Sequence, residues 1–72
     1  MLRKGDYVAK DQSRLRGLRA ERKITMEEMA KIIDVTPLTY SKKERGISEF
    51  TLPEAVIISK FLGIEISEIF LN

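Results

Sequence analysis

The segment from Met26 to Gly46, MEEMAKIIDVTPLTYSKKERG, predicts two short helices joined by a tight turn. Thr25 and a glutamate three residues later form a capping-box pattern, which begins the first helix. The second helix begins after Thr36, with Pro37 at its first position, where a missing N–H costs nothing. Asp34 lies between the helices, and aspartate tolerates the positive φ of a tight turn better than most residues. The segment therefore predicts a helix-turn-helix.

The spacing of apolar residues indicates which side of each helix faces inward. On the first helix these residues are one and then three positions apart, at Met29, Ala30 and Ile33. On the second, Tyr40 is the strongest candidate for a core contact. Gly46 is expected to end this helix just after Arg45, because glycine readily adopts the left-handed conformation of a helix stop.

One further helix is expected before this pair, over about 12–22. Asp11 or Ser13 is expected to cap it, since both side chains can accept a hydrogen bond from a helix amide. Leu15 and Leu18 are three residues apart and mark its inner face.

Two further helices are expected after the pair. Thr51 caps the first of these, and Glu54 completes a second capping box. Gly63 ends this helix, and a short last helix covers about 66–71. The inner stripe of the longer helix is expected to comprise Leu52, Ala55, Val56, Ser59 and Leu62.

Five short helices and no sheet predict an all-α domain. The chain has 72 residues, which is one domain near the lower limit for folding without disulfides or metals. Residues 11–72 are expected to form this domain. Residues 1–10 show no helical period and are expected to be a flexible arm or, through Tyr7–Val8–Ala9, a short strand.

The composition excludes several kinds of chemistry. The chain has no cysteine and no histidine, so disulfides are excluded and a zinc site is disfavoured. Without these residues an enzyme would need paired carboxylates in a pocket, which so short a chain is poorly able to enclose. We expect no metal, cofactor or small-molecule ligand. No apolar run is long enough to span a membrane, and we expect a cytoplasmic protein.

Charge is divided unevenly along the chain. Residues 1–23 contain eight lysines and arginines against three acidic residues, a net charge of +5. Residues 24–46 are balanced, and residues 47–72 carry one lysine against four glutamates, a net charge of −3. This division indicates a front that faces a polyanion. Ordinary solvated helix faces are an equally good explanation on charge alone.

The chain resembles the Cro/repressor-like (Xre-type, lambda-repressor-like) helix-turn-helix family over roughly Leu15 to Phe70. Four stretches carry the resemblance: LRAERKIT (18–25), MEEMAKIIDVT (26–36), YSKKERG (40–46) and TLPEAVIISKFLGI (51–64). The resemblance implies a small transcriptional regulator that acts as a repressor, of the kind found in phages, mobile elements and bacteria. It would bind double-stranded DNA, with the helix over about 36–45 in the major groove.

The resemblance also implies which residues contact DNA. Family members read bases mainly from the positions of Pro37, Leu38 and Lys42. If Tyr40 faces inward these three face outward, and Lys42 can donate to guanine while Leu38 contacts a thymine methyl. The alternative for Lys42 is a solvated helix end that complements the helix dipole. Phosphate contacts are expected from Thr25, Met26, Thr39, Ser41, Lys43, Arg45 and Ser48, helped by loop amides near Ile47 and by diffuse attraction to Arg14, Arg16, Arg22 and Lys23.

An ion pair between Arg19 and Glu44 is implied by the resemblance and would fix the angle of the recognition helix. Three positions depart from the family pattern. Met26 stands where a phosphate-binding glutamine is usual, and Lys43 stands at a usually apolar position. Pro37 and Leu38 replace polar base readers, so discrimination is expected to depend more on apolar contacts and DNA shape.

The last third of the chain is more apolar than a small monomer needs. Ile57 and Phe61 are four residues apart and lie off the predicted inner stripe, and Phe70 follows in the tail. We expect these three residues to form a homodimer interface that matches a palindromic DNA site. In the alternative, the tail isoleucines only close the core. A second candidate function is a protein–protein interaction module that uses this apolar face.

Overall fold

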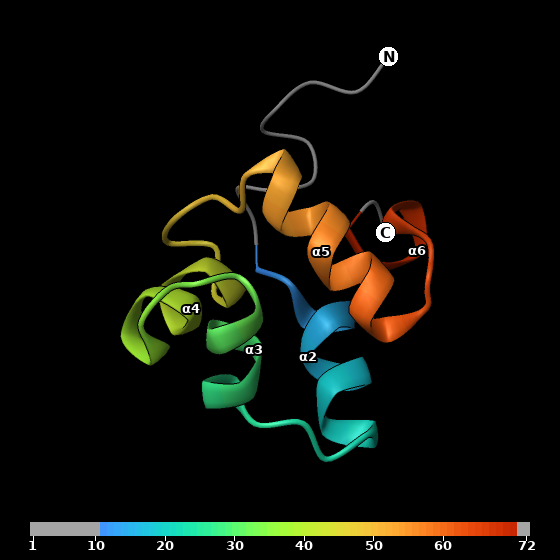
Figure 1. Cartoon of the computed structure of the whole chain (residues 1–72), viewed down its shortest axis with the longest axis horizontal. Helices are drawn as coiled ribbons and strands as arrows, with labels where there is room; N and C mark the ends of the chain where they lie inside the picture. Colours follow the sequence, from blue (N-terminus) through green and yellow to red (C-terminus); the bar gives the residue numbers. More distant parts are fainter. Residues whose placement is uncertain (1–10, 71–72) are drawn as a thin grey trace.

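The computed structural model describes residues 11–70, and within this range it contains five helices and no strand (Figure 1). This confirms the all-α prediction. The expected arm, residues 1–10, lies outside the described residues. The helices are α2 (Ser13–Glu21), α3 (Met26–Ile32), α4 (Pro37–Glu44), α5 (Leu52–Leu62) and α6 (Ile66–Phe70). Helix α3 packs against α4 and α5, while α2 packs against α4 and α6.

Three threonines begin three of the helices, as predicted. Thr25, Thr36 and Thr51 are the N-caps of α3, α4 and α5, and each side chain accepts a hydrogen bond from the amide three residues on. Both capping boxes are complete, with the glutamate carboxylate accepting from the cap amide at 2.8 Å and 2.9 Å. Each cap stabilises its helix by about 1 kcal/mol, which matters for helices this short.

The start of α2 lies within one residue of the prediction, but its capping residue was predicted wrongly. Its N-cap is Gln12, whose side chain makes no capping hydrogen bond. The Gln12 amide instead donates to the carbonyl of Glu44 at 2.8 Å, and Gln12 is buried. Asp11, one of the expected caps, pairs with Arg16 at 2.6 Å. A contact with the end of α4 therefore anchors the entrance to α2 in place of a local cap.

The tight turns require a left-handed backbone. Asp34 has φ = 60° in the turn between α3 and α4, as predicted, and the two expected stop glycines, Gly46 and Gly63, have φ of 82° and 71°. Lys23, after α2, also has a positive φ of 57°, which its residue type does not predict. Lysine is strained in this conformation, so the α2–α3 connection is set by the packing of the helices it joins.

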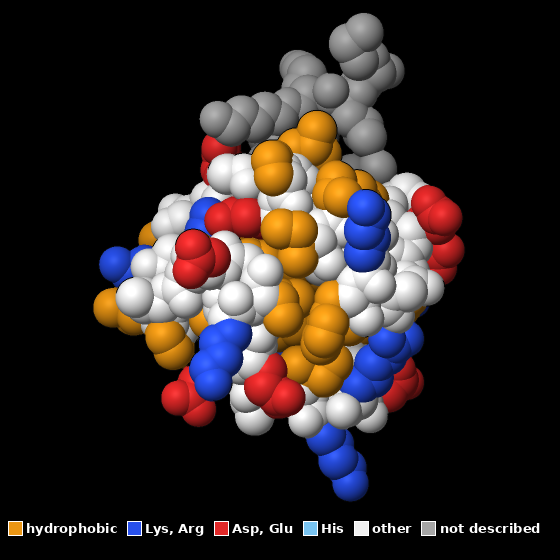
Figure 2. Space-filling view, in the orientation of Figure 1, with side chains coloured by type: hydrophobic (Ala, Val, Ile, Leu, Met, Phe, Trp, Pro, Cys, Tyr) orange, Lys and Arg blue, Asp and Glu red, His pale blue; other side chains and the backbone are white. Residues whose placement is uncertain are grey.

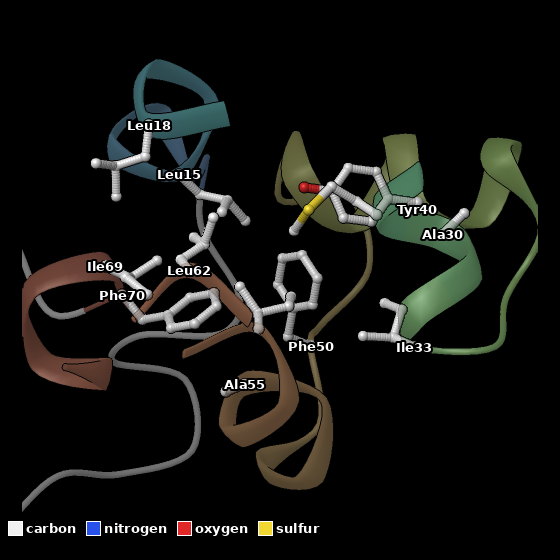
Figure 3. Close-up of a cluster of buried hydrophobic side chains, with 12 residues drawn as sticks. Leu15, Leu18, Ala30, Ile33, Tyr40, Phe50, Ala55, Leu62, Ile69 and Phe70 are labelled. Carbon is white, nitrogen blue, oxygen red and sulfur yellow. The ribbon is translucent and has the colours of Figure 1, made fainter. Parts of the chain in front are cut away.

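An aromatic cluster holds the helices together. Phe50 lies in the loop before α5 and is fully buried. Its ring makes edge contacts with Tyr40 of α4, at 5.9 Å between centroids, and with Phe70 of α6, at 5.4 Å. Figure 3 shows Phe50 between Tyr40 and Phe70, with Leu15 and Leu62 nearby. The cluster therefore links α4 to α6 through Phe50.

The inner face of α5 differs from the predicted stripe. Ala55, Ile58 and Leu62 are buried, whereas Leu52 is exposed and Val56 is half-buried. The prediction placed Ile58 outside this face and was wrong there. Phe50, in the loop before α5, belongs to the same buried cluster as Ala55 and Ile58, whereas Leu52 lies outside it.

Candidate nucleic-acid interface

Helix α4 presents one exposed stripe. Leu38, Lys42 and Arg45 are all exposed, and their spacing of four and then three residues places them on one side of the helix. Tyr40 and Glu44 are buried on the other side. Leu38 is 63% exposed. Figure 1 shows α4 at the side of the molecule opposite α6.

The residues beside the stripe are held by local hydrogen bonds. Pro37 is exposed, while Thr39 and Ser41 are half-buried. The Thr36 hydroxyl donates to the Thr39 hydroxyl at 2.9 Å, and Arg45 Nε donates to the Ser41 carbonyl at 3.3 Å. The second bond holds the stem of Arg45 along the helix. The structure therefore brings together the three predicted base readers and three of the predicted phosphate contacts.

The amides expected to hold phosphate are mostly engaged within the chain. Ile47 N and Ser48 N both donate to the carbonyl of Lys42, at 2.9 Å and 3.2 Å. The predicted role of these loop amides is therefore wrong, and only the hydroxyl of Ser48 remains as a candidate. At the start of α3, both the amide and the hydroxyl of Thr25 bind Glu28, which removes Thr25 as a phosphate contact.

Lys43 was predicted to contact phosphate, and the structure contradicts this. Its side chain is only 11% exposed, and its ammonium pairs with Glu54 at 3.0 Å and donates to the Glu49 carbonyl at 2.7 Å. The ammonium also lies 5.9 Å from the centroid of the Phe50 ring. Glu54 is eleven residues away, across a loop, so no local spacing could have shown the pair. Lys43 fastens the end of α4 to the start of α5.

Lys43→Met should leave affinity for duplex DNA within about twofold of wild type, because the ammonium faces Glu54 and not the exposed stripe. The substitution removes one partner of the pair and leaves the Glu54 carboxylate without its counter-charge, although the Thr51 amide still donates to it, so the free energy of unfolding should fall by about 1–3 kcal/mol. Duplex titration by fluorescence anisotropy, together with a urea melt, checks both values. A tenfold loss of affinity in a folded Lys43→Met variant would show that Lys43 does contact a DNA phosphate.

The Arg19–Glu44 ion pair that the resemblance implied is present. Arg19 Nε and Nη2 donate to the two carboxylate oxygens of Glu44 at 2.9 Å and 3.1 Å, and Arg19 Nη1 donates to the carbonyl of Ile24 at 3.0 Å. The Tyr40 hydroxyl donates to the same carboxylate at 2.7 Å. Arg16 Nε lies 3.7 Å from it. Every buried side-chain polar atom in residues 11–70 has a partner, so Glu44 is buried but fully satisfied.

This network changes the acidity of its members. Burial, reinforced by the hydrogen bond to Glu44, raises the pKa of the Tyr40 hydroxyl above its usual value of 10.0. The hydrogen bond to Glu44 raises the pKa of Arg19 as well. Folding therefore holds the Tyr40 proton more tightly than the unfolded chain does. Sequence reasoning missed the role of Tyr40 as a hydrogen-bond donor, although its spacing of four residues from Glu44 on one helix was a usable signal.

Tyr40→Phe should lower the free energy of unfolding by about 2 kcal/mol at pH 7, because it removes a hydrogen bond to a charged group. The native pKa is raised, so the protonated Tyr40 stabilises the fold fully below about pH 10 and progressively less above it. The stability difference between wild type and Tyr40→Phe should therefore shrink above pH 10, by up to about 1.4 kcal/mol per pH unit. Urea melts from pH 8 to 11.5 measure it. A difference that stays constant would contradict the assigned hydrogen bond.

The basic residues in and just after α2 make contacts within the domain, and these contacts do not form a surface that faces DNA. Arg14 Nε donates to the carbonyl of Glu68 in α6 at 3.3 Å, and Arg22 donates to the carbonyl of Leu62 at the end of α5. Arg16 pairs with Asp11. The guanidinium groups of Arg14 and Arg22 tie α2 to the C-terminal helices. Their charge still adds to the electrostatic field of the domain. None of these contacts places either guanidinium group beside the exposed stripe of α4.

The outer side of α5 carries an apolar face. Ile57 is 41% exposed and Phe61 is 48% exposed. Hydrophobic side chains gather over α5 in the middle of the face shown in Figure 2. Phe70, the third predicted interface residue, is fully buried and packs on Phe50, so its assignment to an interface was wrong. Its position in a five-residue terminal helix gave no sign that the ring turns inward.

This arrangement defines a class of protein: a five-helix domain that presents an exposed side of the second helix of a helix-turn-helix. The sequence profile of the helix-turn-helix family matches residues 15–69, and the chain belongs to this family of DNA-binding transcription regulators. The lambda-repressor-like fold expected from the sequence is confirmed.

Two solved structures of one regulator are similar to the chain. Both are crystal structures of the clp gene regulator ClgR from Corynebacterium glutamicum, each 28% identical in sequence. One has a TM-score of 0.70, with 81% of this chain and 75% of that chain covered. The other has a TM-score of 0.73, with 81% and 62% covered. No protein of curated function matches the chain in sequence. No helix among residues 11–70 is both long enough and apolar enough to cross a bilayer.

Proposed function

We propose that this domain represses transcription by binding a specific DNA duplex, with α4 in the major groove. The observation that supports this most strongly is the exposed stripe of Leu38, Lys42 and Arg45 on a helix whose other side is fixed by the Glu44 network. A groove-reading helix needs exposed side chains on a rigid support. The similarity to ClgR, described as a gene regulator, adds to this support.

The proposed contacts divide into two kinds. Bases are read by Pro37, Leu38 and Lys42, with Lys42 donating to guanine. Backbone phosphates are held by Arg45 and by the amide of Met26, which as the first residue of α3 has no acceptor inside its helix. Side-chain hydroxyls supply the remaining phosphate contacts, at Thr39, Ser41 and Ser48. A repressor with these contacts acts on DNA in the cytoplasm of a prokaryotic cell or a phage host.

Selection of bound sequences from a random duplex pool tests the proposal directly. We expect a short motif to be enriched, arranged as two inverted half-sites about one helical turn apart. Failure to enrich any motif, with no binding of duplex at low salt, would contradict the function. In that case retention of other proteins by the apolar face of α5 would favour the protein-interaction module.

We also propose that two copies dimerise on the DNA through the apolar face of α5. Ile57 and Phe61 are both about half exposed on the same helix, which is costly for a monomer unless a partner covers them. A stable free dimer usually buries about 800 Å² per partner. The apolar face of α5 extends over a helix of only eleven residues, so we infer that two copies associate mainly when both occupy adjacent half-sites.

Ile57→Glu with Phe61→Glu should abolish the two-copy complex and lower affinity for the inverted-repeat duplex at least about tenfold, because like charges then face each other across the two-fold axis. Binding to a single half-site should change little. Gly17→Glu with Ala20→Glu adds the same charge at exposed positions of α2 and is the matched control. Analytical ultracentrifugation with each duplex measures the stoichiometry. Two copies bound by the Ile57/Phe61 variant would exclude this interface.

A further inference from the structure

Lys23, in the connection between α2 and α3, has a backbone conformation that does not suit lysine. Its φ of 57° lies in the left-handed region, which glycine and asparagine adopt at lower cost. The other positive-φ positions in residues 11–70 are occupied by glycine or aspartate. Strained backbone of this kind is concentrated at functional sites, so the turn alone does not account for a lysine at this position.

The turn that carries Lys23 is fixed on both sides by hydrogen bonds. The Lys23 amide donates to the Ala20 carbonyl at 3.0 Å, and the Ile24 amide donates to the Arg19 carbonyl at 2.9 Å. Arg19 Nη1 donates to the Ile24 carbonyl at 3.0 Å, while Nε and Nη2 of the same guanidinium bind Glu44 of α4. The backbone at Lys23 is therefore tied to α4 as well as to the two helices that it joins.

The Lys23 side chain is exposed, and within residues 11–70 no hydrogen bond or ion pair engages its ammonium. The four arginines of the same region each bind an oxygen atom elsewhere in the domain: Arg14, Arg16, Arg19 and Arg22. Lys23 is thus the one cation in residues 11–24 without such a contact. Its charge remains available to a ligand, on a backbone that is held in place.

We propose that Lys23 binds one particular phosphate of the DNA backbone, beside the groove that α4 enters, and that the strained turn positions its ammonium for this contact. The inference rests on the proposed function and goes beyond diffuse attraction, because it assigns one charge to one phosphate. Lys23 precedes Met26 by three residues, at most about 10 Å of chain, so its ammonium starts close to an amide already proposed to hold phosphate. The compact, strongly charged ammonium of lysine suits such a contact.

Lys23→Asn should make the fold no less stable and DNA binding weaker, because asparagine tolerates the left-handed backbone but carries no charge. Affinity for the duplex selected by the wild-type chain should fall about fivefold to tenfold at about 0.1 M salt, and the slope of log affinity against log salt should fall by about 0.9. Lys31→Gln, which removes one charge from an exposed position on α3, is the matched control and should weaken binding less than about twofold. Urea melts and fluorescence anisotropy measure the two quantities.

Duplexes with a single uncharged methylphosphonate locate the contact, because each has a methyl group in place of one charged phosphate oxygen. The substitution is moved along both strands of the selected duplex, one position at a time. At the phosphate that Lys23 holds, the wild-type chain should lose about fivefold to tenfold in affinity, whereas Lys23→Asn should lose less than about twofold. At every other position the two proteins should lose affinity equally.

Each possible result bears on the inference. If Lys23→Asn loses stability and affinity together, the lysine has a structural role and the inference is wrong. If it weakens binding no more than Lys31→Gln does, or if no methylphosphonate position separates it from the wild-type chain, the attraction is diffuse and the inference is again wrong, while the proposed function stands. If the wild-type chain enriches no motif and binds no duplex at low salt, the proposed function fails and the inference fails with it.

Discussion

Arg19→Ala and Glu44→Gln should each lower the free energy of unfolding by about 3–5 kcal/mol, which is among the largest effects expected in this domain. Each change removes one partner of a buried, doubly hydrogen-bonded ion pair and leaves the other buried without its counter-charge or its full set of hydrogen bonds. At about 0.05–0.15 kcal/mol per residue, a domain of this size is stable by only about 4–11 kcal/mol, so the loss removes a large part of its stability. Urea unfolding followed by far-ultraviolet circular dichroism measures the change.

The control is an ion pair of the same chemistry on the surface. Arg16 and Asp11 are 2.6 Å apart but largely exposed, so Asp11→Asn should cost about 1 kcal/mol or less. The double variant Arg19→Met/Glu44→Leu removes both charges and should be clearly more stable than the sum of the two single losses predicts. If Arg19→Ala cost no more than Asp11→Asn, the pair would not be what holds α2 to α4.

The helix starts were predictable because their causes are local. Thr25 and Thr51 each bind a glutamate three residues on, and Pro37 marks the first position of α4 by its chemistry alone. The left-handed turn at Asp34 was likewise visible in the residue type. Such signals span at most one turn of chain, and the sequence displays them directly.

The contacts across the domain could not be predicted in the same way. Lys43 reaches Glu54 and the Glu49 carbonyl, and Phe70 turns inward onto Phe50, because of how α4, α5 and α6 meet. The α2 start at Gln12 likewise depends on the end of α4. For these residues, side-chain type and spacing fitted an exposed role as well as a buried one. The stripe on α4 was predictable because the burial of Tyr40 alone fixes the rotation of the helix.

Lys42→Gln with Arg45→Gln should weaken binding to the selected duplex about a hundredfold at moderate salt. The base contact proposed for Lys42 is worth about 1–3 kcal/mol, and the phosphate contact proposed for Arg45 adds to it. The slope of log affinity against log salt should also fall by about 0.9 for each phosphate that the variant no longer neutralises. Both side chains are exposed, so the variant should fold normally.

A matched variant separates this effect from the loss of net charge. Lys31→Gln with Lys60→Gln removes the same two charges from exposed positions on α3 and α5. It should weaken binding only slightly, through the reduced field of the whole domain. Equal losses in the two variants would mean that attraction is diffuse and that α4 has no special position on the duplex.

The central claim is that the exposed side of α4 lies against DNA, and amide chemical shifts of the labelled chain during titration with duplex test it most directly. The largest changes should occur over residues 37–47 and at Met26, where α4 and the start of α3 meet the groove and its phosphates. The outer side of α5 should change only with a duplex that carries two half-sites. Changes centred on residues 52–61 with a single half-site, and none over residues 37–45, would show that DNA binds elsewhere and would contradict the account.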